Sequence, residues 1–267
     1  MTMQDTIQHS AGGQGAEQAY DDKEVLMELS GLGRSFGGVK AVDDVSMKLR
    51  AGIVTTLVGP NGAGKTTLFN LITGQLARDT GHITWLGRRI DTIKPHQAAR
   101  LGMVRSFQDL RLFEKMTVEE NIMTVSEWWS LPRLTTRAKR AERMEAMDSI
   151  LERTALTDKR HTRAIDLSYA ERKFLSLARI IAARGRLWLL DEPASGLDPN
   201  SYQRLLKIIR DEIQSGVTVC IIEHNLDIVT GISDRIAFLD RGQLLADDVP
   251  SVVLNDPKLT AIYFGER

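Results

Sequence analysis

The chain has 267 residues, and its 35 lysines and arginines balance its 35 aspartates and glutamates, so the formal net charge is zero. A balanced charge gives no long-range field that attracts nucleic acid or anionic lipid, which argues against a dedicated DNA-binding protein. The single cysteine, Cys220, excludes an internal disulfide and a multi-cysteine metal site, as suits a reducing cytoplasm. It lies in an apolar run, residues 217–222, which predicts a buried position. No stretch approaches the roughly 20 apolar residues that span a bilayer.

Three regions differ in character along the chain. Residues 1–23 are rich in Gln, Gly, Ala, Ser and Asp and lack the apolar centre of a secretion signal, which predicts a flexible tail. From residue 25 to about residue 93, short alternating runs separated by glycines predict antiparallel strands in two layers of sheet. Between residues 109 and 165 helical periodicity dominates. Arg140, Met144, Met147 and Leu151 lie along one stripe at this periodicity.

Residues 59–67, Gly-Pro-Asn-Gly-Ala-Gly-Lys-Thr-Thr, match the phosphate-binding pattern G-x-x-x-x-G-K-[ST] without a mismatch. A run rich in β-branched residues, 54–58, precedes them, and apolar residues at helical spacing follow until Gly74, which predicts strand, loop and helix. This order directs backbone N–H groups and the positive helix end at one point. We expect Lys65 to reach the β- and γ-phosphates of a nucleotide and the Thr66 hydroxyl to bind Mg²⁺. The alternative is a glycine-rich turn with an incidental lysine.

Two adjacent carboxylates, Asp191 and Glu192, follow the apolar run of residues 187–190. Such runs alternate with amphipathic helical segments in this part of the chain, which predicts a parallel sheet with helices on its faces. Strands of a parallel sheet end at one edge beside the ligand, so Asp191 can orient Mg²⁺ near Thr66. Glu192 can then polarise the attacking water as general base. The alternative is a solvated pair of acids that opens a loop.

Residues 167–171, Leu-Ser-Tyr-Ala-Glu, resemble the LSGGQ signature of ABC-type ATPases, and the order and spacing of the other motifs agree with that family. The resemblance covers about residues 25–265. It implies an α/β fold of the ABC-type P-loop NTPases, with a mixed sheet core, an antiparallel β subdomain and an inserted helical subdomain. The implied bounds are 24–267 for the ABC ATPase domain, 24–108 and 166–267 for the core plus antiparallel β subdomain, and 109–165 for the helical subdomain.

The resemblance also assigns roles to individual residues. Phe36 is implied to stack on adenine, Gln108 to link Mg²⁺ to the helical subdomain, and His224 to contact the γ-phosphate. The implied catalytic residues are Glu192, His224 and Gln108. The implied nucleotide-binding residues are Phe36, Gly59, Pro60, Asn61, Gly62, Ala63, Gly64, Lys65, Thr66, Thr67, Ser168, Ala170 and Asp198, and the implied Mg²⁺ ligands are Thr66, Gln108 and Asp191.

Two of these residues have a helix-capping alternative. Ser168 and Glu171 form an S-x-x-E capping box before an apolar stripe, and a serine that caps a helix can still donate its hydroxyl proton to a phosphate oxygen. Asp198 followed by Pro199 has the pattern of an N-cap with proline in the first helical position, so capping alone explains both residues.

Three others have a packing or surface alternative. His224 could simply end a strand, and Gln108 could be a surface residue after a strand over residues 103–107. Phe36 could belong to the core.

The signature departs from LSGGQ at Tyr169, Ala170 and Glu171. ATPase subunits of branched-chain amino acid importers resemble this chain with their LSYGEQ variant, which leaves Ala170 and Arg172 as the differences. A methyl group at Ala170 could crowd a phosphate that approaches closely. The similarity to the importer subunits extends to residues 107–113, 116–121 and 255–265.

The resemblance therefore implies an ATPase subunit, with ATP and Mg²⁺ as ligands, of an importer for branched-chain or related amino acids or amides. The implied partners are a second ATPase subunit, two integral membrane permeases and, indirectly, an extracytoplasmic solute-binding protein, with no nucleic acid. The implied location is peripheral, at the cytoplasmic face of the inner membrane. Trp128, Trp129, Phe113 and Met116 are candidates for the permease-docking groove, with core packing as the alternative.

A soluble ABC ATPase of iron–sulfur cluster assembly has similar length and motifs and is the alternative function. A chromosome-maintenance ATPase would need a long coiled-coil insertion, which the residues between Thr67 and Leu167 do not contain. A translation-factor type would need two phosphate loops, and the chain has one.

Overall fold

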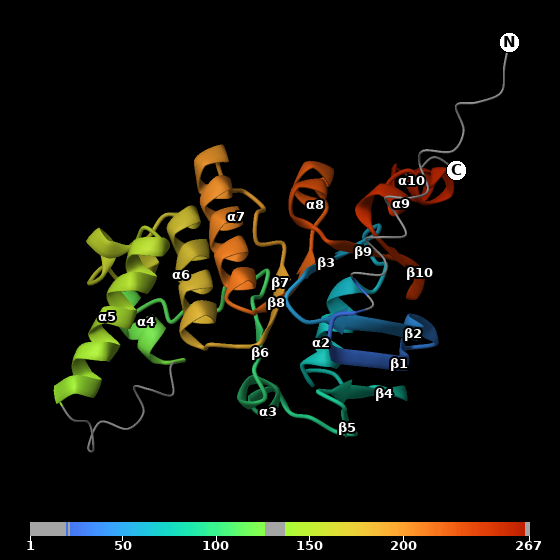
Figure 1. Cartoon of the computed structure of the whole chain (residues 1–267), viewed down its shortest axis with the longest axis horizontal. Helices are drawn as coiled ribbons and strands as arrows, with labels where there is room; N and C mark the ends of the chain where they lie inside the picture. The colour runs from blue at the N-terminus through green and yellow to red at the C-terminus, as the bar shows by residue number, and fades with distance from the viewer. Residues whose placement is uncertain (1–19, 21, 126–136, 265–267) are drawn as a thin grey trace, which may run out of the picture.

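The structure is a computed structural model that describes residues 20, 22–125 and 137–264. Its strands form two sheets (Figure 1). The strands are β1 (Val25–Phe36), β2 (Val39–Arg50), β3 (Val54–Val58), β4 (Thr80–Trp85), β5 (Arg88–Ile90), β6 (Met103–Arg105), β7 (Leu187–Asp191), β8 (Thr218–Ile222), β9 (Arg235–Asp240) and β10 (Gln243–Asp248). The helices are α2 (Lys65–Ile72), α3 (Pro95–Arg100), α4 (Val118–Met123), α5 (Arg137–Arg153), α6 (Tyr169–Ala182), α7 (Pro199–Gln214), α8 (Leu226–Ile232), α9 (Pro250–Val253) and α10 (Pro257–Phe264), with short 3-10 turns η2 (Thr157–Lys159) and η3 (Ala164–Asp166).

The two sheets differ in strand direction. The smaller sheet has the order β2-β1-β4-β5, and all of its pairs are antiparallel. The larger sheet has the order β10-β9-β3-β8-β7-β6, in which β10 pairs antiparallel with β9 and the remaining pairs are parallel. The predicted α/β fold with a mixed sheet and an additional antiparallel sheet is confirmed. The ends of the parallel strands β3, β7 and β8 therefore lie at one edge, where the candidate residues follow them.

Alternate residues of the buried strand β7 face two different cores. Leu187 and Leu189 belong to the core that α2 shares with the antiparallel sheet. Trp188 and Leu190 point to the other face and belong to the core beneath α6 and α7. This alternation is the period-2 geometry of a strand that is covered on both faces. In Figure 1, α6 and α7 accordingly lie on one side of the central strands, and α2 lies with β1, β2 and β4 on the other.

The residues of the predicted stripe lie on one helix, α5, but differ in burial. Met147 and Leu151 are buried in the core beneath α6 and α7, whereas Met144 is 37% exposed. The side chain of Arg140 lies outside the described residues. The sulfur of Met144 lies 3.9 Å from Nη2 of Arg160.

Other expectations concern single positions. Cys220 is buried within β8, as predicted. The strand expected over residues 103–107 is shorter, because β6 pairs with β7 only from Met103 to Arg105. Tyr20, from the segment predicted as a tail, donates a hydrogen bond to the carbonyl of Lys48 (2.9 Å).

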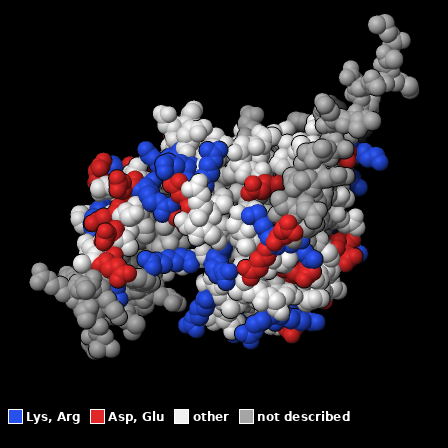
Figure 2. Space-filling view, viewed as in Figure 1, with Lys and Arg blue, Asp and Glu red and all other residues white. Residues whose placement is uncertain are grey.

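Two further observations concern the surface. Among the residues that the structure describes, no helix is both long and apolar enough to cross a bilayer. Acidic and basic side chains are interspersed over the face shown in Figure 2, in line with the balanced charge of the chain. Trp128 and Trp129, proposed above as groove residues, lie outside the described residues.

Candidate nucleotide-binding and catalytic site

The phosphate loop, residues 59–67, connects the end of β3 to the start of α2, as predicted. Two of its glycines have no room for a side chain. Gly59 has φ +143°, and a Cβ there would lie 1.9 Å from the carbonyl oxygen of Leu239. Gly64 has φ +101°, and its Cβ would lie 2.2 Å from the carbonyl oxygen of Ala41. Glycine is therefore required at both positions by backbone conformation and by close approach of a second backbone.

The other side of the phosphate loop is open. Gly62 has φ +80°, and no described atom lies within 4 Å of the Cβ position. In the described part of the chain, the backbone N–H groups of Asn61, Gly62 and Gly64 have no hydrogen-bond acceptor. Unpaired N–H groups at the start of a helix form a binding site for an anion, because they add to the positive end of the helix dipole. The loop thus fits a nucleotide phosphate group.

Lys65 is held close to the loop by its own neighbours. Its Nζ donates hydrogen bonds to the carbonyls of Gly59 (2.7 Å) and Pro60 (3.0 Å), and the residue is only 6% exposed. Burial lowers the pKa of Lys65, while the charges of Glu192 and Asp191 act in the opposite direction. A desolvated ammonium group beside open N–H donors attracts a phosphate more strongly than one in water.

Asp191 ends β7 and is buried in a pair with an arginine that the sequence did not single out. Its Oδ2 lies 3.2 Å from Nη2 of Arg105, and each side chain is at most 5% exposed. Arg105 Nη1 also donates to Oδ1 of Asn70 on α2 (2.5 Å). Burial raises the pKa of Asp191, and the charge of Arg105 lowers it. The carboxylate of Asp191 and the hydroxyl of Thr66 are both hard oxygen donors, which are the ligands that Mg²⁺ prefers.

Glu192 and His224 are brought into contact. Glu192 Oε1 lies 2.9 Å from Nε2 of His224, and the two side chains are 23% and 36% exposed, respectively. Glu192 has a positive φ of 47°, and its N–H donates to the carbonyl of Ile222 at the end of β8 (3.0 Å). A partly exposed carboxylate can accept a proton from water, and His224 is in reach to hold that carboxylate in place.

Gln108 belongs to the same region as Asp191 and Glu192. The three residues line one cleft, to which Tyr169 and Lys173 of α6 also belong. Gln108 itself is exposed and follows β6 by three positions. The structure thus brings Gln108 together with the acids at the end of β7, whereas sequence order separates them by more than eighty positions.

Ser168, Asp198 and Phe36 are placed differently. Ser168 Oγ accepts from the N–H of Glu171 (3.3 Å), and Asp198 Oδ1 accepts from the N–H of Asn200 (3.0 Å), so each caps its own helix as predicted. Phe36 is 45% exposed, which contradicts a core role. Among the described residues, no hydrogen bond or ion pair joins these three to the phosphate loop. Ala170 is half-buried in the first turn of α6.

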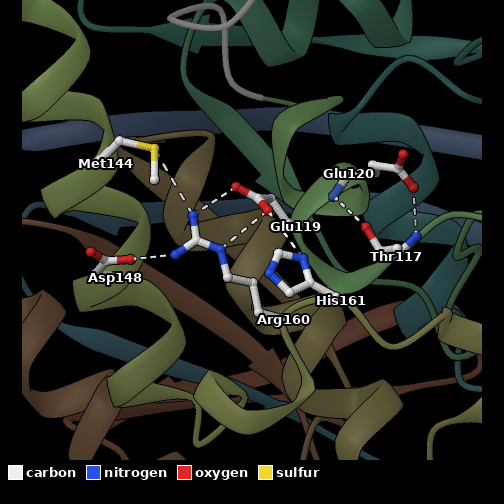
Figure 3. A network of polar contacts seen from close by, with 7 residues as sticks. All are labelled: Thr117, Glu119, Glu120, Met144, Asp148, Arg160 and His161. Carbon is white, nitrogen blue, oxygen red and sulfur yellow. Dashed lines mark hydrogen bonds and ion pairs between the residues drawn. The ribbon is translucent and has the colours of Figure 1, made fainter.

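The segment before Ser168 is anchored by Arg160 (Figure 3). The guanidinium of Arg160 donates to both carboxylate oxygens of Glu119 on α4 (3.1 and 2.7 Å) and to Oδ1 of Asp148 on α5 (2.7 Å). This pairing lowers the pKa of Glu119 and raises that of Arg160. Thr117 and Glu120 cap α4 next to it with a capping box. The approach to α6 is therefore fixed to α4 by a bidentate ion pair and to α5 by a single hydrogen-bonded ion pair.

Residues 42–195, more than half of the chain, match the family model of the ABC transporter. The chain belongs to the ABC transporter family. As a member of this family it binds and hydrolyses ATP.

Curated ABC relatives match along nearly their whole length. The branched-chain amino acid transport ATP-binding protein LivG of Salmonella typhimurium is 38% identical over 251 residues, which cover 90% of this chain and 98% of LivG. BraF of Pseudomonas aeruginosa, another high-affinity branched-chain amino acid transport ATP-binding protein, is 37% identical over 90% of this chain and 98% of BraF. The lipopolysaccharide export ATP-binding protein LptB of Acidithiobacillus ferridurans is 35% identical over 91% and 98%.

Solved structures show the same fold. A crystal structure of a nucleotide-free ATP-binding cassette from an ABC transporter superposes with a TM-score of 0.79 at 30% identity, covering 91% of this chain and all of that chain. An ATP-binding cassette in its ADP conformation superposes with a TM-score of 0.77 at 29% identity. The relatives are transport proteins, which does not favour the iron–sulfur assembly alternative.

Proposed function

We propose that this chain is the ATPase subunit of an importer for branched-chain or related amino acids or amides, attached to the cytoplasmic face of the inner membrane through two permeases. The observation that carries the hydrolytic part is the contact between Glu192 and His224 at the sheet edge that also holds the phosphate loop. The similarity to LivG and BraF supports the importer part. Tyr169 in the signature is also the residue of the importer variant LSYGEQ of that motif, which supports the importer part.

In the proposed reaction, the N–H groups of the phosphate loop and the ammonium of Lys65 bind the phosphates of ATP. Glu192 accepts the proton of the attacking water on a carboxylate oxygen, and His224 holds that carboxylate and contacts the γ-phosphate. Phe36, exposed at the end of β1, provides a face for adenine. Thr66, Asp191 and Gln108 would hold Mg²⁺, which when bound neutralises negative charge on the phosphates. The open faces of the loop and of Glu192 lie on the protein surface, where nucleotide and water can enter.

A second ATPase subunit completes the site in this proposal. Ser168 and Asp198 both stand at exposed helix N-termini, before α6 and α7, and among the described residues their side chains bind the first turn of their own helices. A second copy that packs head to tail would present these N-termini to the phosphates bound by the first copy. Hydrolysis then removes the γ-phosphate between the two chains, and the interface can reopen.

The permease partner would dock on the helical region. Phe113, Met116 and Met123 expose 47%, 38% and 36% of their surface there, close to Gln108 in sequence. Exposed apolar side chains of this size on neighbouring turns are typical of a protein-binding surface. Gln108 connects that surface to the nucleotide site, so a change at the phosphates can reach the permease. The solute-binding protein would act on the permeases from outside.

The substitution Glu192→Gln tests the hydrolytic assignment. Gln keeps the size and the contact with His224 but cannot accept the proton, so we expect ATP hydrolysis to fall by about 10²- to 10⁴-fold. Binding of a fluorescent ATP analogue should stay within about twofold, because the phosphate loop is untouched. Glu28→Gln, on β1, is the matched control and should keep full turnover. Near-normal turnover in Glu192→Gln would remove Glu192 from the role of base.

The importer assignment is tested by what the full chain binds in its native host. A tagged chain should appear in the membrane fraction together with two permeases, and leucine with its binding protein should stimulate ATP hydrolysis by the reconstituted complex. Copurification with soluble cluster-assembly proteins, or stimulation by lipopolysaccharide instead of amino acids, would contradict this assignment.

A further inference from the structure

A lysine of α6, the helix that begins in the signature, binds the loop that begins with Glu192. Lys173, on α6, donates hydrogen bonds from Nζ to the carbonyl of Glu192 (2.8 Å) and to the carbonyl of Pro193 (3.3 Å). The lysine is half-buried between α6 and this loop. The ammonium of Lys173 thus bridges the carbonyls of two consecutive residues, the first of which, Glu192, has a positive φ of 47°.

Glu192 needs such support because a non-glycine residue with positive φ is strained unless its surroundings hold it. Its N–H is fixed by the carbonyl of Ile222, and its carbonyl is fixed by Lys173. On the far side, the buried carboxylate of Glu223 accepts from the N–H of Ala194 (3.1 Å). Together these contacts define the direction in which the Glu192 side chain leaves the backbone. That direction brings its carboxylate within 2.9 Å of His224.

A second contact joins the same helix to the same loop. A Cβ at Gly196 would lie 2.9 Å from Cε1 of Tyr169, so the tyrosine ring rests directly on this glycine. The Lys173 ammonium lies 5.5 Å from the centre of the Tyr169 ring, within the range of a cation–π contact. Gly196 has φ +73°, so two features of the loop, its conformation and the ring above it, require glycine.

We propose that Lys173 and Tyr169 are positioning residues for Glu192: through the loop of residues 192–196 they set the direction of its carboxylate. The role rests on the proposed function, in which Glu192 is the base. Ser168, proposed to meet the nucleotide of a second subunit, stands at the start of the same helix, five positions before Lys173. The residue proposed to meet a second subunit's nucleotide and the residues that support Glu192 are therefore on the same helix.

The first test compares Lys173→Met with Lys173→Arg. Methionine keeps the length and removes the donors, so we expect kcat to fall about 10- to 100-fold, as for a displaced catalytic group, while KM for ATP stays within twofold. Arginine can donate to both carbonyls and should retain most of kcat. Melting temperatures and affinity for a fluorescent ATP analogue identify unfolded variants. A Lys173→Met variant with kcat within twofold of the parent, or one whose affinity for the analogue falls in parallel, would overturn the proposal.

The second test uses the contact between Tyr169 and Gly196. Gly196→Ala should lower kcat more in the parent than in a Tyr169→Gly background, because removal of the ring leaves space for the added methyl. Strictly additive effects of the two substitutions would contradict the contact. The activity of Glu192→Gln distinguishes failure of the proposed function from failure of the positioning role. If that variant turns over ATP, the assignment of Glu192 as base fails. If it is inactive while Lys173→Met has normal activity, only the positioning role fails.

Discussion

The phosphate loop and the signature edge, defined here as Ser168 and Asp198, are built in opposite ways. The phosphate loop depends on contacts within the chain: Gly59 and Gly64 touch the backbone of other segments, and Lys65 is nearly buried. At the signature edge, the polar groups are exposed and bind only the first turn of their own helices. The first region is therefore pre-organised by folding. The exposed polar groups of the second region can form further hydrogen bonds with a partner, as expected of a surface that completes a site on another subunit.

The comparison predicts that substitutions near the phosphate loop mainly reduce stability and ATP binding, whereas those at the signature edge mainly reduce association. The largest effect on stability is expected for Arg105→Met. This change leaves the buried carboxylate of Asp191 without its partner, at a cost of about 3–5 kcal/mol in the free energy of unfolding. Arg89→Met, which removes an exposed ion pair with Asp91, is the control and should cost less than about 1 kcal/mol. Urea unfolding measures both, and equal losses would contradict the account.

The same variant has a predicted pH dependence. Burial raises the pKa of Asp191 above that of the unfolded chain, and loss of Arg105 removes the charge that lowers it. A carboxyl group whose pKa is higher in the folded than in the unfolded chain gives its full contribution to stability below the unfolded pKa, about 3.9. This contribution is lost as the pH rises through the pKa of the folded chain. The deficit of Arg105→Met relative to the parent should therefore be smaller at pH 5 than at pH 8. A stability deficit that is larger at pH 5 than at pH 8 would contradict this prediction.

Alanine substitutions at two glycines of the phosphate loop should distinguish the cost of the left-handed backbone from the cost of steric overlap with another segment. Gly64→Ala adds a methyl 2.2 Å from the carbonyl oxygen of Ala41, and we expect it to cost about 2–5 kcal/mol from the left-handed backbone and the overlap together. Gly62→Ala has open space around the added carbon and should cost only about 1–2 kcal/mol. Thermal unfolding without nucleotide measures the difference. Equal costs would show that close approach does not constrain the loop.

Ser168→Ala should have the smallest effect on stability and a clear effect on association. Loss of the cap costs about 1 kcal/mol, and ATP affinity of the isolated chain should not change. Thr117→Ala removes the equivalent cap of α4 and is the matched control, because it should lose similar stability without affecting association. The assay is ATP-dependent association followed by light scattering. If both variants associate like the parent, Ser168 is a helix cap and nothing more.

Local features of the site were predictable from the sequence. The phosphate loop, the strand before it and the helix after it follow from a pattern of adjacent residues, and so do the caps at Ser168 and Asp198. Cys220 was correctly predicted to be buried from the apolar run around it. Each of these depends on interactions within a few positions, which propensity and spacing describe well.

Contacts between distant segments were not predictable. Arg105 and Asp191 are 86 positions apart, and nothing in the residues around Arg105 indicates a buried partner. The positive φ of Glu192 could not be predicted because a left-handed residue is expected at glycine, and contacts with distant residues such as Lys173 and Ile222 hold it there. The role of Lys173 had one indication in the sequence: it lies one helical turn after Tyr169 and thus on the same face of α6. The domain bounds at 24, 108 and 166 stay a prediction.

The central claim, that the site is completed by a second copy of the chain, is tested most directly by the mass of Glu192→Gln in solution. With ATP and Mg²⁺ at saturating concentration, mass photometry or light scattering should give twice the mass of one chain, and with ADP the mass of one chain. Adding Ser168→Arg, which places a bulky side chain at the signature edge, should return the ATP sample to the mass of one chain while the bound ATP remains. A single-chain mass for Glu192→Gln that is the same with ATP, with ADP and without nucleotide would contradict the claim.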